Sequence, residues 1–246
     1  SGGGARLGTA WLVSVAVARR GCVTVTSPGP GAVVLVNPNT SAATTAMMTA
    51  LARRALGPAL TVRGVTVARG PRMLTEPAAL RASAPEVLAA GLRATAGGCA
   101  GLLVGAFGDP GVAALRAAVD VPVVGIGEAA LREAAADGTP FGVATTTPLL
   151  ASAVSDHVSA LGLADRFTGL RLTVGDAAHL SAHPALLLDR LELAVLACAE
   201  RDGAQAVVIG GGPLGEAAEE LRSRCPVRIV APIPAACRAL TRLLAP

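Results

Sequence analysis

The chain has 246 residues, of which 52% are hydrophobic and 2% aromatic, and its formal net charge is +4. All 21 basic residues are arginine and tyrosine is absent, which excludes Schiff-base lysines, P-loop lysines and tyrosine acid–base chemistry. The arginines are scattered without a basic block, so we expect no nucleic-acid partner. No apolar run approaches the roughly 18–20 residues that span a bilayer, so we expect no membrane partner.

The chain divides into a glycine- and proline-rich start and a regularly alternating remainder. We interpret residues 1–31 as a flexible N-terminal leader. From Ala32 onward, short apolar runs alternate with longer segments of helical periodicity, which is typical of parallel α/β sheets. This pattern predicts strands at 32–36, 60–67, 101–105, 122–126, 140–145, 168–173, 205–210 and 226–230. It predicts helices at 41–56, 79–96, 110–118, 127–137, 147–161, 184–201, 213–223 and 233–244.

Two kinds of strand-end turn occur once in each half of the chain. The sequences VGAFGDP (104–110) and IGGGP (209–213) each follow an apolar run and open a helical segment. The sequences NPNT (37–40) and ATTTP (144–148) form the second pair. Turns of this kind place backbone N–H groups at helix N-termini, where anions bind well. The repeat therefore predicts two similar α/β halves with one ligand site in the cleft between them.

Several segments resemble the hydantoin racemase branch of the aspartate/glutamate racemase superfamily. They are the turns 37–40, 107–111 and 144–148 and the segments 122–130 and 156–163. The resemblance covers roughly residues 32–246 and is most specific between Phe107 and Ala130. It implies two pseudo-symmetric Rossmann-like lobes with mostly parallel sheets and an inter-lobe cleft. It also implies a first lobe at 32–127 plus 226–246 and a second lobe at 128–225.

The resemblance also identifies a departure from the family. Family racemases carry one cysteine in each strand-end turn, and the two thiols act as opposed bases. Ala106 and Gly211 align with these cysteines, so the resemblance implies the family's scaffold without its usual chemistry. The cysteines of this chain lie elsewhere, and we expect them to be buried and inert. They are Cys22, Cys99, Cys198, Cys225 and Cys237.

The four turns supply the candidate ligand contacts. The candidates are Asn37, Asn39, Thr40, Ala106, Phe107, Gly108, Thr145, Thr146, Thr147, Gly211 and Gly212. Each has a structural alternative, because asparagine and threonine also cap helices and glycine also serves tight turns.

The candidate acid–base residues are Asp109, Glu128 and His157. Structural roles are open for all three: Asp109 as a helix N-cap, Glu128 as a first-turn carboxylate and His157 as a helix residue. Glu216 is expected to be solvated. His179 and His183 are four residues apart but lack a third ligand, so we predict no metal and no cofactor.

Together these features predict a cysteine-independent enzyme of isomerase, lyase or cyclase type. Its substrate would be small and anionic or carbonyl-rich. Two alternatives stay open: an amino-acid or hydantoin racemase or epimerase with non-cysteine bases, and a non-catalytic small-molecule binder. The lysine-free, alanine- and arginine-rich composition suggests a GC-rich bacterial source and specialised metabolism. The odd number of cysteines, without disulfide or zinc spacing, predicts a cytoplasmic location. Homo-oligomer formation also stays open.

We predict that residues 1–31 are dispensable for folding. Their glycine- and proline-rich composition offers little apolar surface to pack on the body of the protein. A chain that starts near Gly31 is expected to keep its melting temperature within a few degrees in thermal unfolding. A large drop would show that the segment packs on the body.

Overall fold

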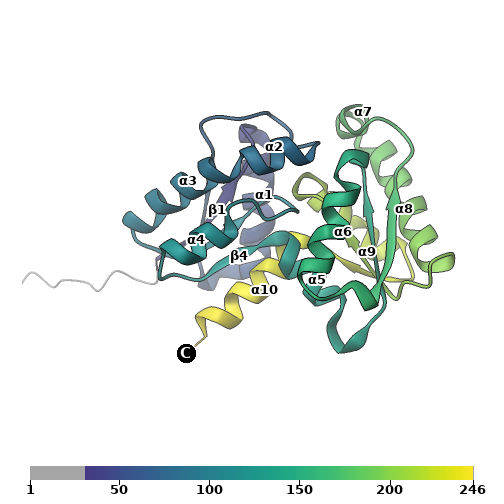
Figure 1. Ribbon diagram of the computed structural model, residues 1–246. Coiled ribbons are helices and arrows are strands. Elements are labelled where there is room, and N and C mark those ends of the chain that lie inside the picture. The colour runs from purple at the N-terminus through teal and green to yellow at the C-terminus, as the bar shows by residue number, and fades with distance from the viewer. Residues whose placement is uncertain (1–30, 246) are drawn as a thin grey trace, which may run out of the picture.

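The computed structural model describes residues 31–245, which form two α/β lobes side by side (Figure 1). The expected leader and Cys22 lie outside the described residues, apart from Gly31. Lobe 1 contains β1 (Ala32–Asn37), β2 (Val62–Thr66), β3 (Cys99–Val104) and β4 (Val123–Gly125) in the order β2-β1-β3-β4. Lobe 2 contains β5 (Phe141–Thr145), β6 (Phe167–Leu172), β7 (Ala206–Ile209) and β8 (Arg228–Val230) in the order β6-β5-β7-β8. Every pairing is parallel, and the two orders are equivalent.

Helices cover both faces of each sheet. In lobe 1 these are α1 (Ala42–Leu56), α2 (Pro77–Ala82), α3 (Ala84–Ala96) and α4 (Val112–Ala118). In lobe 2 they are α6 (Ala151–Ala160), α7 (Ala177–Ala182), α8 (Pro184–Glu200) and α9 (Gly215–Arg224). Short 3₁₀ turns occupy Gly57–Ala59, Ala136–Gly138, Pro148–Leu150, Ala164–Arg166 and Gly212–Leu214. The predicted architecture of two pseudo-symmetric lobes with parallel sheets is confirmed.

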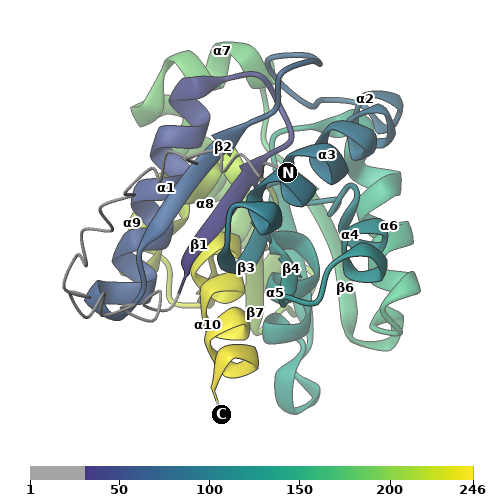
Figure 2. The ribbon, with the colours of Figure 1, turned by 90° about the vertical axis from the view of Figure 1, so that its left-hand side faces the viewer.

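The alternation of side chains along a strand explains the layers. Val33 and Leu35 pack with α1 on one face, whereas Val34 and Val36 pack with α3 and α4 on the other. Figure 2 shows α1 and α3 on opposite sides of the lobe 1 sheet. A strand buried on both faces is apolar at every position, and β1 is so from Ala32 to Val36.

Two helices lie where the lobes meet. α5 (Ile126–Ala134) follows β4, and α10 (Pro232–Leu244) follows β8. They pack on each other, while α5 also contacts β7 and α10 contacts α1 and β3. The segment 226–246 was expected in lobe 1, but its strand β8 pairs with β7 in lobe 2. Only α10 returns to lobe 1, because its buried side chains Ile233 and Leu240 join the core beneath α1.

Two helices differ from the sequence-based expectation. The predicted helix 79–96 is split into α2 and α3 near Ser83, because Pro85 has no N–H to donate to the carbonyl of Arg81. The short helix α7 was not predicted; Asp176 caps it by accepting a hydrogen bond from the His179 N–H at 2.9 Å. Within the described part of the chain, no helix is both long and apolar enough to cross a bilayer.

Candidate active site

The carboxyl ends of β1, β3, β5 and β7 open onto a cavity of about 290 Å³ between the lobes. Parallel α/β sheets bind ligands at this end of their strands. Most of the predicted contact residues line the cavity. They are Asn39, Ala106, Phe107, Gly108, Thr145, Thr146, Thr147, Gly211 and Gly212. Ala106 and Gly211 occupy equivalent places, two residues beyond the ends of β3 and β7.

Apolar side chains form the walls above this floor. They are Met73, Leu74, Leu80, Leu150, Ala153, Val154, Ala177, Pro184, Leu187, Leu188, Leu214 and Ala217. The charged side chains among the described lining residues are Glu216 and Glu220, and none is an arginine. Glu216 repels an anionic ligand at close range, whereas the charge of Glu220 is balanced by Arg224 at 3.0 Å. The sequence predicted a substrate that is either anionic or carbonyl-rich. This lining fits a neutral, carbonyl-rich ligand better than an anionic one.

Backbone N–H groups of both lobes are free at the cavity floor. Within the described residues, the N–H groups of Ala106, Phe107, Gly108 and Gly212 have no protein hydrogen-bond acceptor. The hydroxyl of Thr145 donates to the Gly210 carbonyl at 2.7 Å and so joins the β5 turn to the β7 turn. Free N–H donors held in fixed turns can stabilise a negative oxygen without reorganising.

Two predicted contact residues do not line the cavity. Asn37 is fully buried, and its amide nitrogen donates to Asn39 Oδ1, the Ser41 carbonyl and Thr45 Oγ1 at 2.8–3.1 Å. It therefore joins β1 to α1, and its position does not support the predicted ligand role. The hydroxyl and N–H of Thr40 donate to the carbonyls of Gly70 and Pro71 at 3.4 and 3.0 Å, which holds Thr40 outside the lining.

Asp109 links the lobes instead of facing the cavity. Its carboxylate accepts hydrogen bonds from the N–H groups of Gly127 and Glu128 at 2.8 and 2.6 Å, at the start of α5. It also lies 3.1 Å from His157 Nε2 on α6. Asp109 thus caps a helix, as the sequence suggested, but the helix is α5. The helix that follows Asp109 in the chain, α4, has Gly111 as its N-cap, with a φ of 78°. His157 lines a shallow neighbouring depression, so neither residue is placed for catalysis in the main cavity.

Residues 33–240 match the family model described as Asp/Glu/Hydantoin racemase. The chain belongs to this family. It is 26% identical over 219 residues to the hydantoin racemase of Paenarthrobacter aurescens, covering 87% of this chain and 91% of the relative. It is 28% identical over 221 residues to that of Rhizobium meliloti, covering 85% and 87%. The solved allantoin racemase of Klebsiella pneumoniae has a TM-score of 0.82 and 25% identity, with 87% of each chain covered.

Glu128, the third predicted catalytic residue, is held in ion pairs outside the cavity. Its carboxylate lies 2.9 Å from both Arg116 and Arg132. Burial raises the pKa of Glu128, but the hydrogen bonds from the two arginines outweigh it and lower the pKa below its ordinary value. The catalytic prediction for Glu128 is therefore not supported by its position.

The cysteines of the described chain do not line the cavity either. Cys99, Cys198, Cys225 and Cys237 are buried, as predicted. Burial raises the pKa of the Cys198 thiol to about 11 and that of Cys237 to about 12. A thiol with such a pKa is protonated at neutral pH and is a poor base or nucleophile. The floor of this family member thus has no thiol from the described residues.

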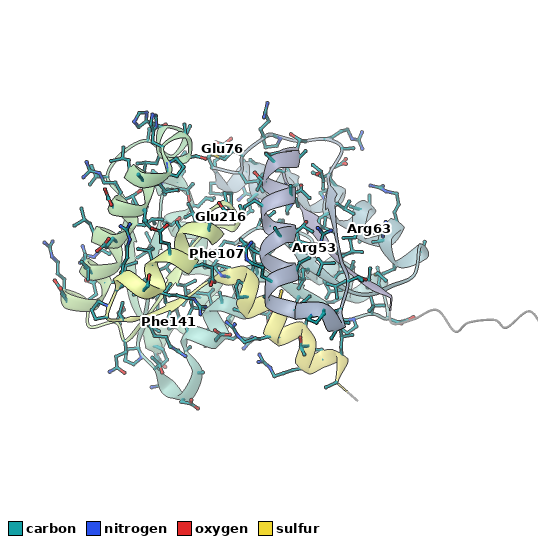
Figure 3. All side chains as sticks on the ribbon, turned by 180° about the vertical axis from the view of Figure 1, so that it is seen from behind. Arg53, Arg63, Glu76, Phe107, Phe141 and Glu216 are labelled. Carbon is teal, nitrogen blue, oxygen red and sulfur yellow. The ribbon has the colours of Figure 1, made fainter. Side chains whose placement is uncertain are left out.

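Sequence reasoning missed the side chains that reach the cavity from helices. Glu216 is exposed, as expected, yet it lines the cavity together with Glu220 one turn further along α9. Their four-residue spacing places both on one face of the helix that starts at the strand-end turn, and this pattern in the sequence indicates their shared position. Leu80 on α2 and Ser181 on α7 gave no signal, because only the meeting of the two lobes brings them together. Figure 3 shows Glu216 and Phe107 where the lobes meet.

We predict that Glu128 stabilises the fold in a pH-dependent way. Because its pKa is lowered in the folded state, its contribution is present at neutral pH and is lost as the pH falls through the acidic range. Glu128→Gln should lower the free energy of unfolding at pH 7 by about 0.5–1 kcal/mol, since the ion pairs are partly exposed, and by less at pH 3. Urea unfolding at both pH values measures this difference. As a control, Glu200→Gln should have no such effect, because no ion pair of Glu200 is found within residues 31–245.

We predict that alanine is tolerated at Gly211 of the floor but destabilises the protein at the adjacent Gly212. A Cβ at Gly212 would lie 2.7 Å from the Gly105 carbonyl oxygen and 2.8 Å from Met48 Sδ. At Gly211 the backbone is extended, with a φ of 161°, and the nearest atom would be Leu214 Cδ1 at 3.2 Å. Gly212→Ala should cost roughly 1–3 kcal/mol of stability and Gly211→Ala less than about 0.5 kcal/mol, by urea unfolding. Equal losses would contradict this account of the floor.

Proposed function

We propose that the chain is a cysteine-independent isomerase that forms the enolate of a small, neutral, carbonyl-rich ring of the hydantoin or allantoin type. Membership of the racemase family and the hydantoin and allantoin racemases among its relatives support this substrate class. The observation that carries the proposal is the cavity floor, where residues of both lobes with unpaired N–H groups line a cavity that has no cationic side chain among the described residues.

The chemistry follows from where charge develops. Removal of the ring proton next to a carbonyl leaves a negative charge that moves onto the carbonyl oxygen. The N–H groups of Ala106, Phe107 and Gly108, or that of Gly212, can donate to this oxygen. One such donor contributes on the order of 10²–10³-fold in rate in other enzymes.

A two-thiol racemisation does not fit this floor. The methyl group of Ala106 and the hydrogen of Gly211 cannot accept a proton, and the buried cysteines of the described chain line other parts of the structure. Those isomerase, lyase and cyclase reactions that break a bond at the carbon next to a carbonyl pass through an enolate, and the same floor would serve each of them. The relatives are racemases, and this favours proton transfer as the reaction to test first.

We predict that the protein exchanges the ring C–H proton of hydantoins. A 5-monosubstituted hydantoin such as 5-benzylhydantoin is incubated with the protein in D₂O, and loss of the C5 proton signal is followed by proton NMR. Exchange faster than in buffer alone is expected. Exchange at the buffer rate, combined with binding of 5,5-dimethylhydantoin by calorimetry, would support the non-catalytic binder and overturn the proposal.

Gly211→Leu tests whether this cavity is the site. The leucine would fill the floor and should abolish exchange, while Gly211→Ala controls for loss of the glycine itself. Both variants should remain folded, because the backbone at Gly211 is extended and its nearest neighbour is the side chain of Leu214. Full activity in a well-folded Gly211→Leu protein would place the site elsewhere.

A further inference from the structure

The acid–base groups of the cavity come from one lobe. Glu216 and Glu220 lie one turn apart on α9 of lobe 2, and both line the cavity. From lobe 1 the side chains at the described lining are apolar apart from Asn39, whose amide cannot take a proton at neutral pH. Asp109, the carboxylate of the turn after β3, is already bonded to the start of α5 and lies next to His157.

The two glutamates differ in how they are paired. Glu220 Oε1 lies 3.0 Å from Arg224 Nη2, so its charge is already balanced by a cation on the same helix. Glu216 has no ion pair and no side-chain hydrogen bond among residues 31–245. Glu216 is therefore the carboxylate of the cavity that is free to accept a proton.

The pseudo-symmetry of the fold allows the position of Glu216 to be compared with the equivalent position in lobe 1. α9 follows the turn after β7 in the way that α4 follows the turn after β3. The first turn of α9 contains Glu216, whereas the first turn of α4 contains no acidic residue. We infer that Glu216 is the catalytic base of the proposed reaction, and that it removes and returns the proton on the lobe 2 face of the substrate only. This inference rests on the proposed function.

The step is a simple proton transfer. A carboxylate oxygen of Glu216 takes the C5 proton, and the C–H electron pair becomes the second bond between C5 and the carbonyl carbon. The carbonyl π electrons move to the oxygen, which the floor N–H groups hold. The reverse step returns the proton from the Glu216 carboxyl to the same face. Racemisation then requires a proton from water on the opposite face, where lobe 1 supplies no acid from the described lining.

A first consequence is that the C5 proton should exchange with solvent faster than the substrate racemises. With a single enantiomer of 5-benzylhydantoin in D₂O, deuterium should enter C5 with retained configuration before the optical rotation decays. The other enantiomer, with its C5 proton on the lobe 1 face, should exchange more slowly. Equal rates of exchange and racemisation from both enantiomers would overturn the one-sided base.

The direct test is substitution of Glu216. Glu216→Gln should lower the exchange rate by on the order of 10²-fold or more, the usual contribution of a positioned base. Glu219→Gln is the matched control, because Glu219 lies on the same helix, is also exposed and does not line the cavity. Calorimetry with 5,5-dimethylhydantoin, which has no C5 proton, should give the same affinity for wild type and Glu216→Gln. Added formate should restore part of the exchange in Glu216→Ala, since it supplies a carboxylate in the vacated space.

The outcomes separate the two proposals. If wild type exchanges hydantoins and Glu216→Gln does so equally fast, the role of Glu216 is wrong while the proposed function stands. If wild type exchanges no hydantoin, the proposed function fails and the inference fails with it. If Glu216→Gln loses exchange together with affinity for 5,5-dimethylhydantoin, Glu216 holds the substrate and is not its base.

Discussion

The cavity floor depends on one buried carboxylate. Asp109 has a φ of 50°, and its side chain is 5% exposed. It holds the start of α5 through two backbone N–H groups and contacts His157 of the other lobe. A Cβ at Gly127 would lie 2.8 Å from the Phe107 carbonyl oxygen, so the start of α5 can approach the turn only without a side chain at this position. Carboxylates at helix N-termini are stabilising, and here this interaction also fixes the turn that carries the free N–H groups.

The same arrangement orients the lobes. The Phe107 side chain packs against the core of lobe 2, and a Cβ at Gly210 would lie 3.6 Å from its ring. On the other side, the Gly212 backbone approaches the Gly105 carbonyl closely. The turns after β3 and β7 therefore interlock, and the cavity is the space left above them. Its floor is built from backbone, so chemistry there relies on fixed N–H groups and on whatever side chains the surrounding helices add.

Symmetry of the backbone and asymmetry of the side chains together define the proposed mechanism. The sheets have equivalent orders, and each fourth strand leads into a helix at the interface of the lobes. Within this frame the two halves differ in their helix starts, with Glu216 on α9 and no acidic counterpart on α4. A pair of opposed bases suits racemisation, whereas one unpaired carboxylate on lobe 2 and N–H groups in both strand-end turns suit enolate formation from one side.

The sequence alone determined the parallel α/β class, the two-fold repeat, and the turns that line the cavity. These are local properties: apolar runs, turn residues and helix periodicity are readable from neighbours in the chain. It could not determine that Asn37 serves α1 and Asp109 serves α5, because each interaction depends on which elements become neighbours. The placement of β8 in lobe 2 and of Glu216 at the cavity was likewise decided only by the tertiary structure. The helix α9 has several exposed carboxylates with similar local patterns, and only the packing of the two lobes against each other places Glu216 and Glu220 at the cavity.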